Sequence, residues 1–357
     1  MKPLIIGDKI AKLPIVQGGM GIGVSLSNLA SAVASEGGVG VLSAAGLGML
    51  YKTSKNYEEN SREGLRQEIR KTRQMTNGIL GVNIMVAMTN FSDLVEIAIE
   101  EEIDIIFAGA GLPLDLPKYL TPTSKTKIVP IISSGRAAKI LTKKWLQNYN
   151  YLPDAFVLEG PLAGGHLGFK KDQLENPDFR LEILLNEVIE ALKPFELEHH
   201  KKIPIIVGGG VYSGEDIHRF LNNGASAVQM ATRFVTTFEC DADDAFKETY
   251  LNAKKEDIVY IDSPVGLPGR AINNTYLEDV KKGLKQPFTC PYDCIITCKK
   301  EDAPYCITLA LLNAKNGKFK NGFAFAGSNA YLATEIISVN TLISELKKEY
   351  DQSIIKT

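Results

Sequence analysis

Short apolar runs, each ended by glycine or by small polar residues, recur through the first two thirds of the chain. The runs are continuous rather than alternating, which is typical of parallel strands that are covered on both faces. Their length of a few residues fits strands better than helices. The pattern therefore predicts eight strands, in residues 13–19, 38–46, 79–85, 103–111, 127–133, 155–160, 203–210 and 225–232.

Apolar residues at helical spacing occupy several of the segments between these runs. Residues 25–38 carry one such stripe, and Ser25 is placed to cap the start of the helix while Gly37 is placed to end it. Further stripes predict helices in residues 92–102, 135–146, 181–193 and 214–224.

Strands that alternate with helices predict parallel pairing with right-handed crossovers. Eight such units in about 240 residues match the size of an α/β fold of the TIM (β/α)8 barrel type. We expect residues 1–255 to form this barrel. An open, doubly wound parallel sheet is the alternative that the pattern leaves open.

Residues 256–357 break this rhythm. A stretch rich in proline and glycine comes first, then a cysteine-rich segment, and then two helical patterns in residues 306–317 and 339–350. We interpret this part of the chain as an added helical subdomain that packs on the barrel and forms a lid over its active face.

Composition narrows the class of protein. The 357 residues are 45% hydrophobic and carry a formal net charge of -2, without a stripe of basic residues, which argues against nucleic acid as a main partner. No apolar run approaches the roughly 20 residues that cross a bilayer, so no membrane partner is expected. The first residues also lack the pattern of an export signal. We expect a cytoplasmic protein that acts on small molecules.

The five cysteines are unevenly distributed. Cys240 stands alone, whereas Cys290, Cys294, Cys298 and Cys306 follow a C-x3-C-x3-C-x7-C spacing, which is unlike a secreted disulfide framework. Four thiolates can hold zinc or an iron–sulfur cluster, and on a helix the first three would share one face. Zinc sites usually use a tighter spacing, so reduced thiols packed as small apolar side chains are the alternative.

Glycines stand at the carboxyl ends of most predicted strands, which is where the active site of such a barrel forms. Glycine lets a flat or charged ligand approach the main chain. Residues 203–214 and 224–234 each lead from a late strand into a helix start, where free amides and the helix dipole favour a phosphate. This combination predicts flavin mononucleotide (FMN), and no G-x-G-x-x-G motif follows the first strand to indicate a dinucleotide.

His166 lies among the glycines of residues 154–169, "DAFVLEGPLAGGHLGF". An unperturbed imidazole titrates near pH 6.5 and can exchange a proton at neutral pH. Its place at a strand end, rather than on the apolar face of a helix, favours a functional role over a histidine that only caps a turn.

Five segments resemble the signature segments of the nitronate monooxygenase family, once called 2-nitropropane dioxygenases. They are "LPIVQGGMG", "GVNIM", "EGPLAGGHLG", "IPIIVGGGV" and "GASAVQMATRF", in the expected order between residues 10 and 275. The family also includes FMN-dependent enoyl-ACP reductases and some NAD(P)H:quinone reductases. The resemblance implies a barrel that holds FMN without a covalent bond.

The resemblance also implies which residues form the site. His166 matches the catalytic histidine of the family. Glu159 stands where many members have Gln, and a carboxylate beside the flavin would alter its potential or pair with a base. Ala231 stands where many members have Gly. The implied cofactor-binding residues are Gly18, Gly19, Met20, Asn83, Glu159, Gly164, Gly209, Gly210, Gln229, Met230, Ala231 and Thr232.

The activity that the resemblance favours is nitronate monooxygenase, which converts an alkyl nitronate and O2 into a carbonyl compound and nitrite. One alternative is a flavin reductase that uses NAD(P)H as co-substrate and acts on enoyl thioesters or quinones. Another is a non-catalytic flavin-binding redox sensor. The sequence leaves the oligomeric state open, although related enzymes are often homodimers.

Overall fold

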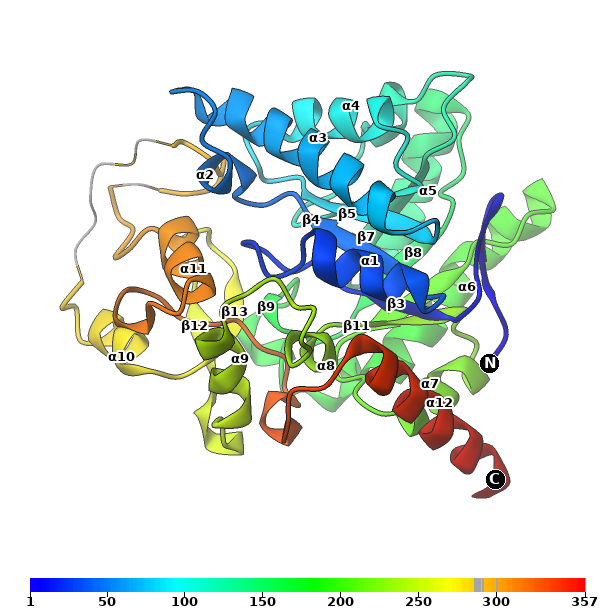
Figure 1. Ribbon diagram of the computed structural model, residues 1–357. Coiled ribbons are helices and arrows are strands. Elements are labelled where there is room, and N and C mark those ends of the chain that lie inside the picture. Colours follow the sequence, from blue (N-terminus) through cyan, green and yellow to red (C-terminus); the bar gives the residue numbers. More distant parts are fainter. Residues whose placement is uncertain (286–289, 291, 300, 357) are drawn as a thin grey trace.

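The computed structural model, which describes residues 1–285, 290, 292–299 and 301–356, contains a closed barrel of eight parallel strands (Figure 1). Each of the eight predicted apolar runs contains one of these strands, so the predicted (β/α)8 barrel is confirmed and the open sheet is excluded. In spatial order the strands are β3 (Ile15–Gln17), β4 (Val39–Ser43), β5 (Ile79–Met85), β6 (Ile105–Gly109), β7 (Lys127–Ile132), β8 (Phe156–Glu159), β10 (Ile205–Gly208) and β11 (Ala227–Met230).

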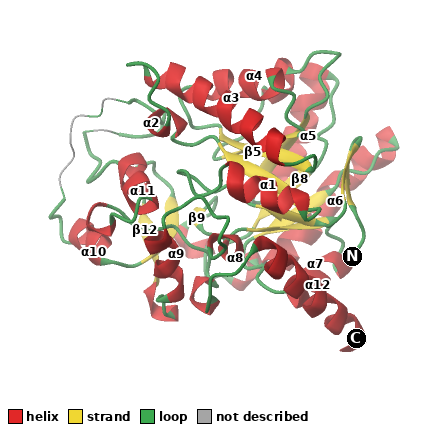
Figure 2. Ribbon diagram, viewed as in Figure 1, coloured by secondary structure: helices red, strands yellow, loops and turns green. Residues whose placement is uncertain are grey.

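Helices surround the barrel strands (Figure 2). Each of the five helical stripes expected from the sequence is found as a helix, and none of the described helices is long and apolar enough to cross a membrane. The helices up to residue 251 are α1 (Ser27–Ser35), α2 (Leu47–Leu50), α3 (Tyr57–Met75), α4 (Phe91–Glu100), α5 (Gly135–Tyr149), α6 (Leu181–His199), α7 (Gly214–Asn222), α8 (Thr232–Val235) and α9 (Asp244–Leu251).

Helix α3 was not indicated by the apolar pattern, although it spans 19 residues. Polar side chains take part in its buried face, because Glu68 is buried and accepts hydrogen bonds from the Ser27 amide and from the Tyr51 hydroxyl. Leu65 and Ile69 supply the buried apolar contacts. A helix that buries polar groups through hydrogen bonds does not show a clear apolar stripe.

Side chains inside the barrel form a separate apolar cluster. Val41, Phe107 and Val157 belong to it, while alternate strand residues pack outward against the helices. A hairpin of β1 (Leu4–Ile6) and β2 (Lys9–Ala11) contributes Leu4, Ile6 and Ala11 to the same cluster. The strands are covered on both faces, which explains why their sequences are continuously apolar.

The remaining elements come from the tail of the chain. Strands β12 (Ile258–Asp262) and β13 (Pro268–Ile272) form a three-stranded sheet with β9 (Gly165–His166), which lies within the predicted barrel part. The predicted tail helices are confirmed as α11 (Ile307–Lys315) and α12 (Val339–Lys356), and α10 (Thr275–Lys281) precedes them. Helix α12 packs along α7 (Figure 1). The division of the chain at residue 255 stays a prediction.

The start of α1 is held by a residue far along the chain. The sequence pattern predicted that Ser25 caps this helix, and this prediction is wrong. The Ser25 hydroxyl instead accepts a hydrogen bond from the Met20 amide. The Asp241 carboxylate accepts hydrogen bonds from the amides of Leu26 at 2.7 Å, Leu29 at 3.2 Å and Asn28 at 3.2 Å. One acidic side chain therefore satisfies three amides at the start of the helix.

We expect Asp241→Ala to lower the free energy of unfolding by about 2 kcal/mol, because three helix-start amides lose their acceptor. Asp241→Asn keeps an acceptor oxygen, so its free energy of unfolding should lie between those of the unaltered protein and of Asp241→Ala. Urea denaturation measures the difference. Asp172→Ala is the control, since Asp172 is an exposed aspartate. Equal stability of the Asp241→Ala variant and the unaltered protein would contradict the assignment.

Candidate active site

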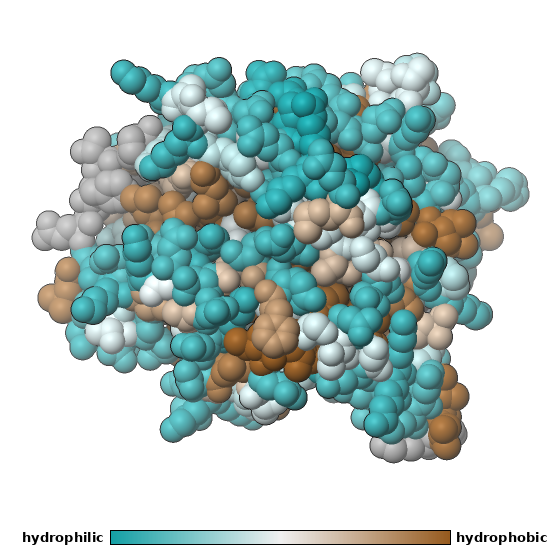
Figure 3. Space-filling view, viewed as in Figure 1, coloured by the Kyte–Doolittle hydropathy of each residue, from teal (hydrophilic) through white to brown (hydrophobic). Residues whose placement is uncertain are grey.

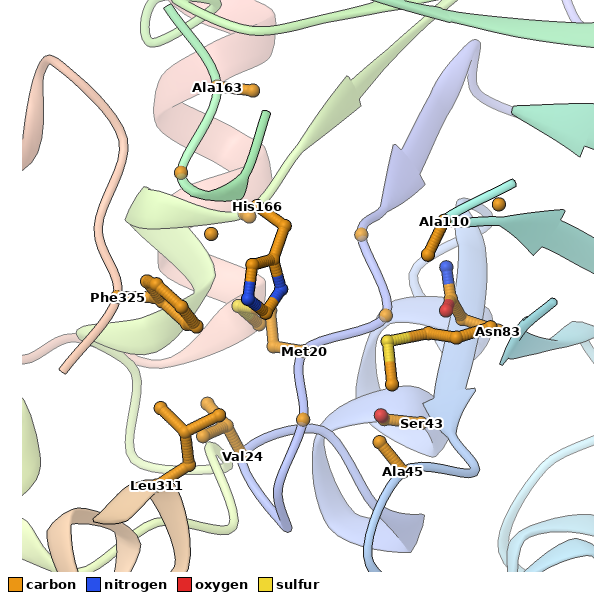
Figure 4. A pocket seen from close by; sticks show the side chains of 18 of the residues that line it. Met20, Val24, Ser43, Ala45, Asn83, Ala110, Ala163, His166, Leu311 and Phe325 are labelled. Atoms are coloured by element: carbon orange, nitrogen blue, oxygen red, sulfur yellow. The ribbon is translucent and has the colours of Figure 1, made fainter. Parts of the chain in front are cut away.

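A cavity of about 280 Å³ lies at the carboxyl ends of the barrel strands. Most of the residues that the sequence singled out line this cavity, together with the tail residues Ile307, Leu311 and Phe325 (Figure 4). The predicted site residues that line it are Gly18, Gly19, Met20, Asn83, Glu159, Gly164, His166, Gly209, Gly210, Gln229, Ala231 and Thr232.

Met230 is placed differently from the other predicted residues. Successive strand residues point to opposite faces, so Gln229 faces the cavity while Met230 lies in the core between the strands and the helices. The Met230 carbonyl accepts a hydrogen bond from the Gly18 amide at 2.8 Å, which fixes the end of β3 beside β11. A direct role of Met230 in binding a cofactor stays a prediction.

His166 is held in place by contacts from the tail. Its strand β9 pairs with β13, and its Nε2 atom lies 2.7 Å from the Ser263 hydroxyl. The imidazole also packs edge-on against Phe325, with the ring centroids 5.0 Å apart (Figure 4). Burial lowers the pKa of His166 to about 4, so the ring is neutral at pH 7.

The tautomer of His166 decides which of its ring nitrogens is basic. If the Ser263 hydroxyl donates to Nε2, the ring proton lies on Nδ1. In that tautomer Nδ1 can donate a hydrogen bond to a ligand. If Nε2–H donates to Ser263, Nδ1 instead has its lone pair available to accept a proton. In both cases Ser263 fixes the orientation of the ring.

Arg270 holds the loop that precedes His166. This arginine is 3% exposed, and its guanidinium donates hydrogen bonds to the Ala163 carbonyl and, at 2.8 Å, to the Tyr260 hydroxyl. No ion pair joins it to a carboxylate within the described part of the chain. A buried cation is costly unless its donors are satisfied, so these contacts tie the loop firmly to β12 and β13. An arginine within the strand sequence "PGRAI" was the signal for this role, and our sequence analysis missed it.

The segment from Phe325 to Asn329 also was not indicated by the sequence. A Cβ on Gly164 would meet the Ala326 backbone carbon at 2.5 Å, so only glycine allows this close approach. Asn329 donates a hydrogen bond from Nδ2 to the Gly210 carbonyl at 2.9 Å. The run of small residues in "FAFAGSNA" was the signal that another backbone packs here.

The glycines after β10 provide amides for an anionic ligand. Gly209 and Gly210 both adopt positive φ angles, of 99° and 87°. No acceptor among the described residues takes a hydrogen bond from either amide or from that of Thr232. Helix α8 is only four residues long, so the helix dipole expected from the sequence is weak. The amides themselves remain suited to a phosphate.

Several polar side chains line the cavity without a hydrogen-bond partner among the described residues. Asn83, Glu159 and Gln229 are three of them, and all three are half-buried. Burial raises the pKa of the Glu159 carboxyl to about 7. The polar atoms of these side chains are therefore available to a polar ligand.

Part of the cavity wall, called its apolar side below, is formed by apolar side chains. Met20, Met88, Ile295, Ile307 and Leu311 line it, and no lysine or arginine is among the described lining residues. Figure 3 shows apolar surface between α2 and α11, the region from which this side of the cavity is built. This side fits an uncharged, apolar group.

The cysteine segment does not have the predicted helical form. Its described residues between Cys290 and Cys298 are not helical, and Ile295 forms a bridge with Met88, so the three cysteines do not stack on a helix face. Cys294 lines the cavity and lies 3.3 Å from the Thr308 hydroxyl. In the parts of the chain that the structure describes, no group of three or more His, Cys, Asp or Glu residues is placed to hold a metal ion. Pro291 and Lys300 of this segment lie outside the described residues.

The fold and this site define an enzyme of the TIM-barrel class with a ligand cavity at the carboxyl ends of its strands. The family profile described as nitronate monooxygenase matches residues 3–349. The chain therefore belongs to the nitronate monooxygenase family, whose named relatives are oxidoreductases.

Individual relatives differ in their named activities. The chain is 28% identical over 272 residues to a Mycobacterium tuberculosis protein, (3aS,4S,5R,7aS)-5-hydroxy-7a-methyl-1-oxo-octahydro-1H-indene-4-carboxyl-CoA dehydrogenase. That match covers 76% of this chain and 66% of the dehydrogenase, slightly less than two thirds of its length. A probable nitronate monooxygenase of Staphylococcus haemolyticus is 25% identical over 306 residues, covering 75% of this chain and 77% of the relative. The structure of FabK from Thermotoga maritima is similar with a TM-score of 0.73 and 27% identity, covering 96% and 94% of the two chains.

We expect the imidazole of His166 to remain neutral down to about pH 4, because burial disfavours its charged form. Nuclear magnetic resonance of the histidine ring protons between pH 4 and 8 measures this titration, and the signal missing from a His166→Gln variant assigns it. A midpoint near the ordinary value of about 6.5 would show that the ring is solvated.

Proposed function

We propose that the protein is an FMN-dependent oxidoreductase that oxidises alkyl nitronates to a carbonyl compound and nitrite with O2. The observation that carries this proposal is a neutral, oriented histidine beside a cavity whose backbone amides and polar side chains lack protein partners. Membership of the nitronate monooxygenase family supports it.

The residues of the cavity fit FMN. The amides of Gly209, Gly210 and Thr232 would hold the phosphate, because they have no acceptor among the described residues. Asn83 and Gln229 offer amide groups to the polar edge of a ring system. Gly19 supports close packing here, since a side chain at this position would collide with Asn83.

FMN would supply the electron-transfer chemistry, and the chain supplies binding, orientation and control of protons. His166 would accept the proton from the α-carbon of a nitroalkane or donate a hydrogen bond to a nitronate oxygen. Both roles use the neutral imidazole, which is the form that burial favours. The apolar side of the cavity would hold the alkyl group and exclude water from the reacting carbon.

A second candidate is an NAD(P)H-dependent reductase that acts on enoyl thioesters or quinones. The similarity to FabK at 27% identity favours it, as does the apolar side of the cavity. In this reaction His166 would act as proton donor, which requires its charged form. The low pKa of His166 makes that form scarce at neutral pH.

Anaerobic mixing separates the two candidates. We expect propane-2-nitronate to bleach the flavin absorbance of the purified protein faster than NADH or NADPH does. His166→Ala should lower kcat/KM for the nitronate about 100-fold while FMN is retained, because the group that would orient the nitronate by a hydrogen bond is lost. His199→Ala is the matched control, since His199 is an exposed histidine. Bleaching by NADH or NADPH alone would favour the reductase. Absence of turnover with any of these substrates, with FMN binding that His166→Ala leaves unchanged, would favour a non-catalytic flavin-binding sensor.

The pH dependence gives an independent test. Nitronate turnover at saturating FMN should show no loss attributable to His166 between pH 8 and pH 5, because its imidazole stays neutral above about pH 4. If His166 were the proton donor of a reductase, the rate would instead rise as the pH falls toward 4. Steady-state rates across this range distinguish the two dependences.

A further inference from the structure

Glu159 is the acidic residue at the end of β8, and its neighbours in the barrel leave space around it. It lies in register with Gly208 of β10, which in turn lies in register with Gln229 of β11. Only a glycine therefore separates the strand positions of these two polar residues. Both Glu159 and Gln229 line the cavity.

The glycine keeps this part of the cavity open. A Cβ on Gly208 would lie 3.3 Å from the Gln229 Cβ and 3.5 Å from its Nε2 atom. Gly18 borders Gln229 on the other side, where a Cβ would lie 3.5 Å from the Gln229 Cγ. The amide of Gln229 thus lies between two positions without side chains, and a planar ligand can reach it together with Glu159.

No cation compensates the charge of Glu159. The other titratable groups that line the cavity are His166 of β9, Tyr57 of α3, Tyr250 of α9 and Cys294 of the tail. Burial lowers the pKa of the histidine and raises the pKa values of the two phenols and the thiol, so all four are neutral at pH 7. The described lining residues include no lysine or arginine, and none of the described residues forms an ion pair with Glu159.

An unpaired carboxylate depends on water for its stability. A ring that fills the cavity displaces that water, which raises the cost of the charged form unless the ligand provides a donor. The neutral acid has no such cost, and its hydroxyl can donate a hydrogen bond to an acceptor atom of the ligand.

We propose that Glu159 binds FMN as a neutral carboxylic acid, so that the cavity takes up a proton together with the cofactor. The carboxylate oxygen gains this proton from solvent, and no other bond changes. This inference rests on the proposed function, because it requires that FMN be the ligand.

The coupling predicts how affinity varies with pH. In the empty cavity burial holds the pKa of Glu159 at about 7. If FMN raises that pKa by a unit or more, the affinity is constant well below pH 7 and is lost as the pH rises above 7. The affinity for FMN falls by at most tenfold for each pH unit, and the fall stops once the pH exceeds the pKa of Glu159 in the complex.

The test compares the full chain with Glu159→Gln, after each has been stripped of flavin by dialysis. Quenching of FMN fluorescence gives Kd at pH 6 and at pH 8. The Kd of the unaltered protein is divided by the Kd of the variant at each pH. We expect this ratio to be about fivefold or more higher at pH 8 than at pH 6. The ratio removes the titration of the FMN phosphate, which both proteins experience equally. An indicator dye in weak buffer should also register proton uptake at pH 8 that the variant lacks.

Two results would overturn the inference. A ratio that does not change with pH would show that Glu159 keeps one protonation state, and a ratio that falls would show that it binds as the anion. If Glu159→Gln does not fold, as judged by circular dichroism, Glu159→Ala takes its place in both measurements. If neither the unaltered protein nor the variant binds FMN, the proposed function is refuted. Failure of the proposed function is therefore distinguishable from failure of this inference.

Discussion

Because β8 pairs with β10 as well as with β7, each barrel strand has a partner on both sides and no free edge remains. The closed sheet leaves an interior that side chains such as Phe107 fill completely. The N-terminal hairpin packs against the same interior cluster. Space for a ligand therefore remains at the carboxyl ends of the strands, where the cavity is lined by strand residues such as Asn83 and Glu159 and by the loops that follow.

The site combines a rigid frame with sparse side chains. Glycines at the ends of β3, β8 and β10 bring the main chain to the cavity surface, and the few polar side chains there lack partners within the protein. The histidine differs from them, because Ser263 and Phe325 both contact its ring.

Much of this architecture was predictable from the sequence, because both faces of each barrel strand are buried and the apolar runs are unmistakable. The glycine loops with His166 and Glu159 were predictable for a related reason, since few folds place so many glycines at strand ends. Helix α3 escaped because Glu68 belongs to its buried face. Contacts between distant segments, such as Asp241 with the start of α1, leave no local signal. Arg270 and the Phe325–Asn329 segment do carry local signals, an arginine within a strand and a run of small residues, but neither signal identifies the segment that it contacts.

The support of His166 by the tail has a consequence for the order in which the enzyme becomes competent. Residues 1–235, which include every barrel strand, are synthesised before Ser263 and Arg270. A nascent chain at that stage holds the histidine loop without its strand partner β13, its hydroxyl contact or its buried guanidinium. The orientation of the imidazole therefore depends on residues that are synthesised after the whole barrel sheet.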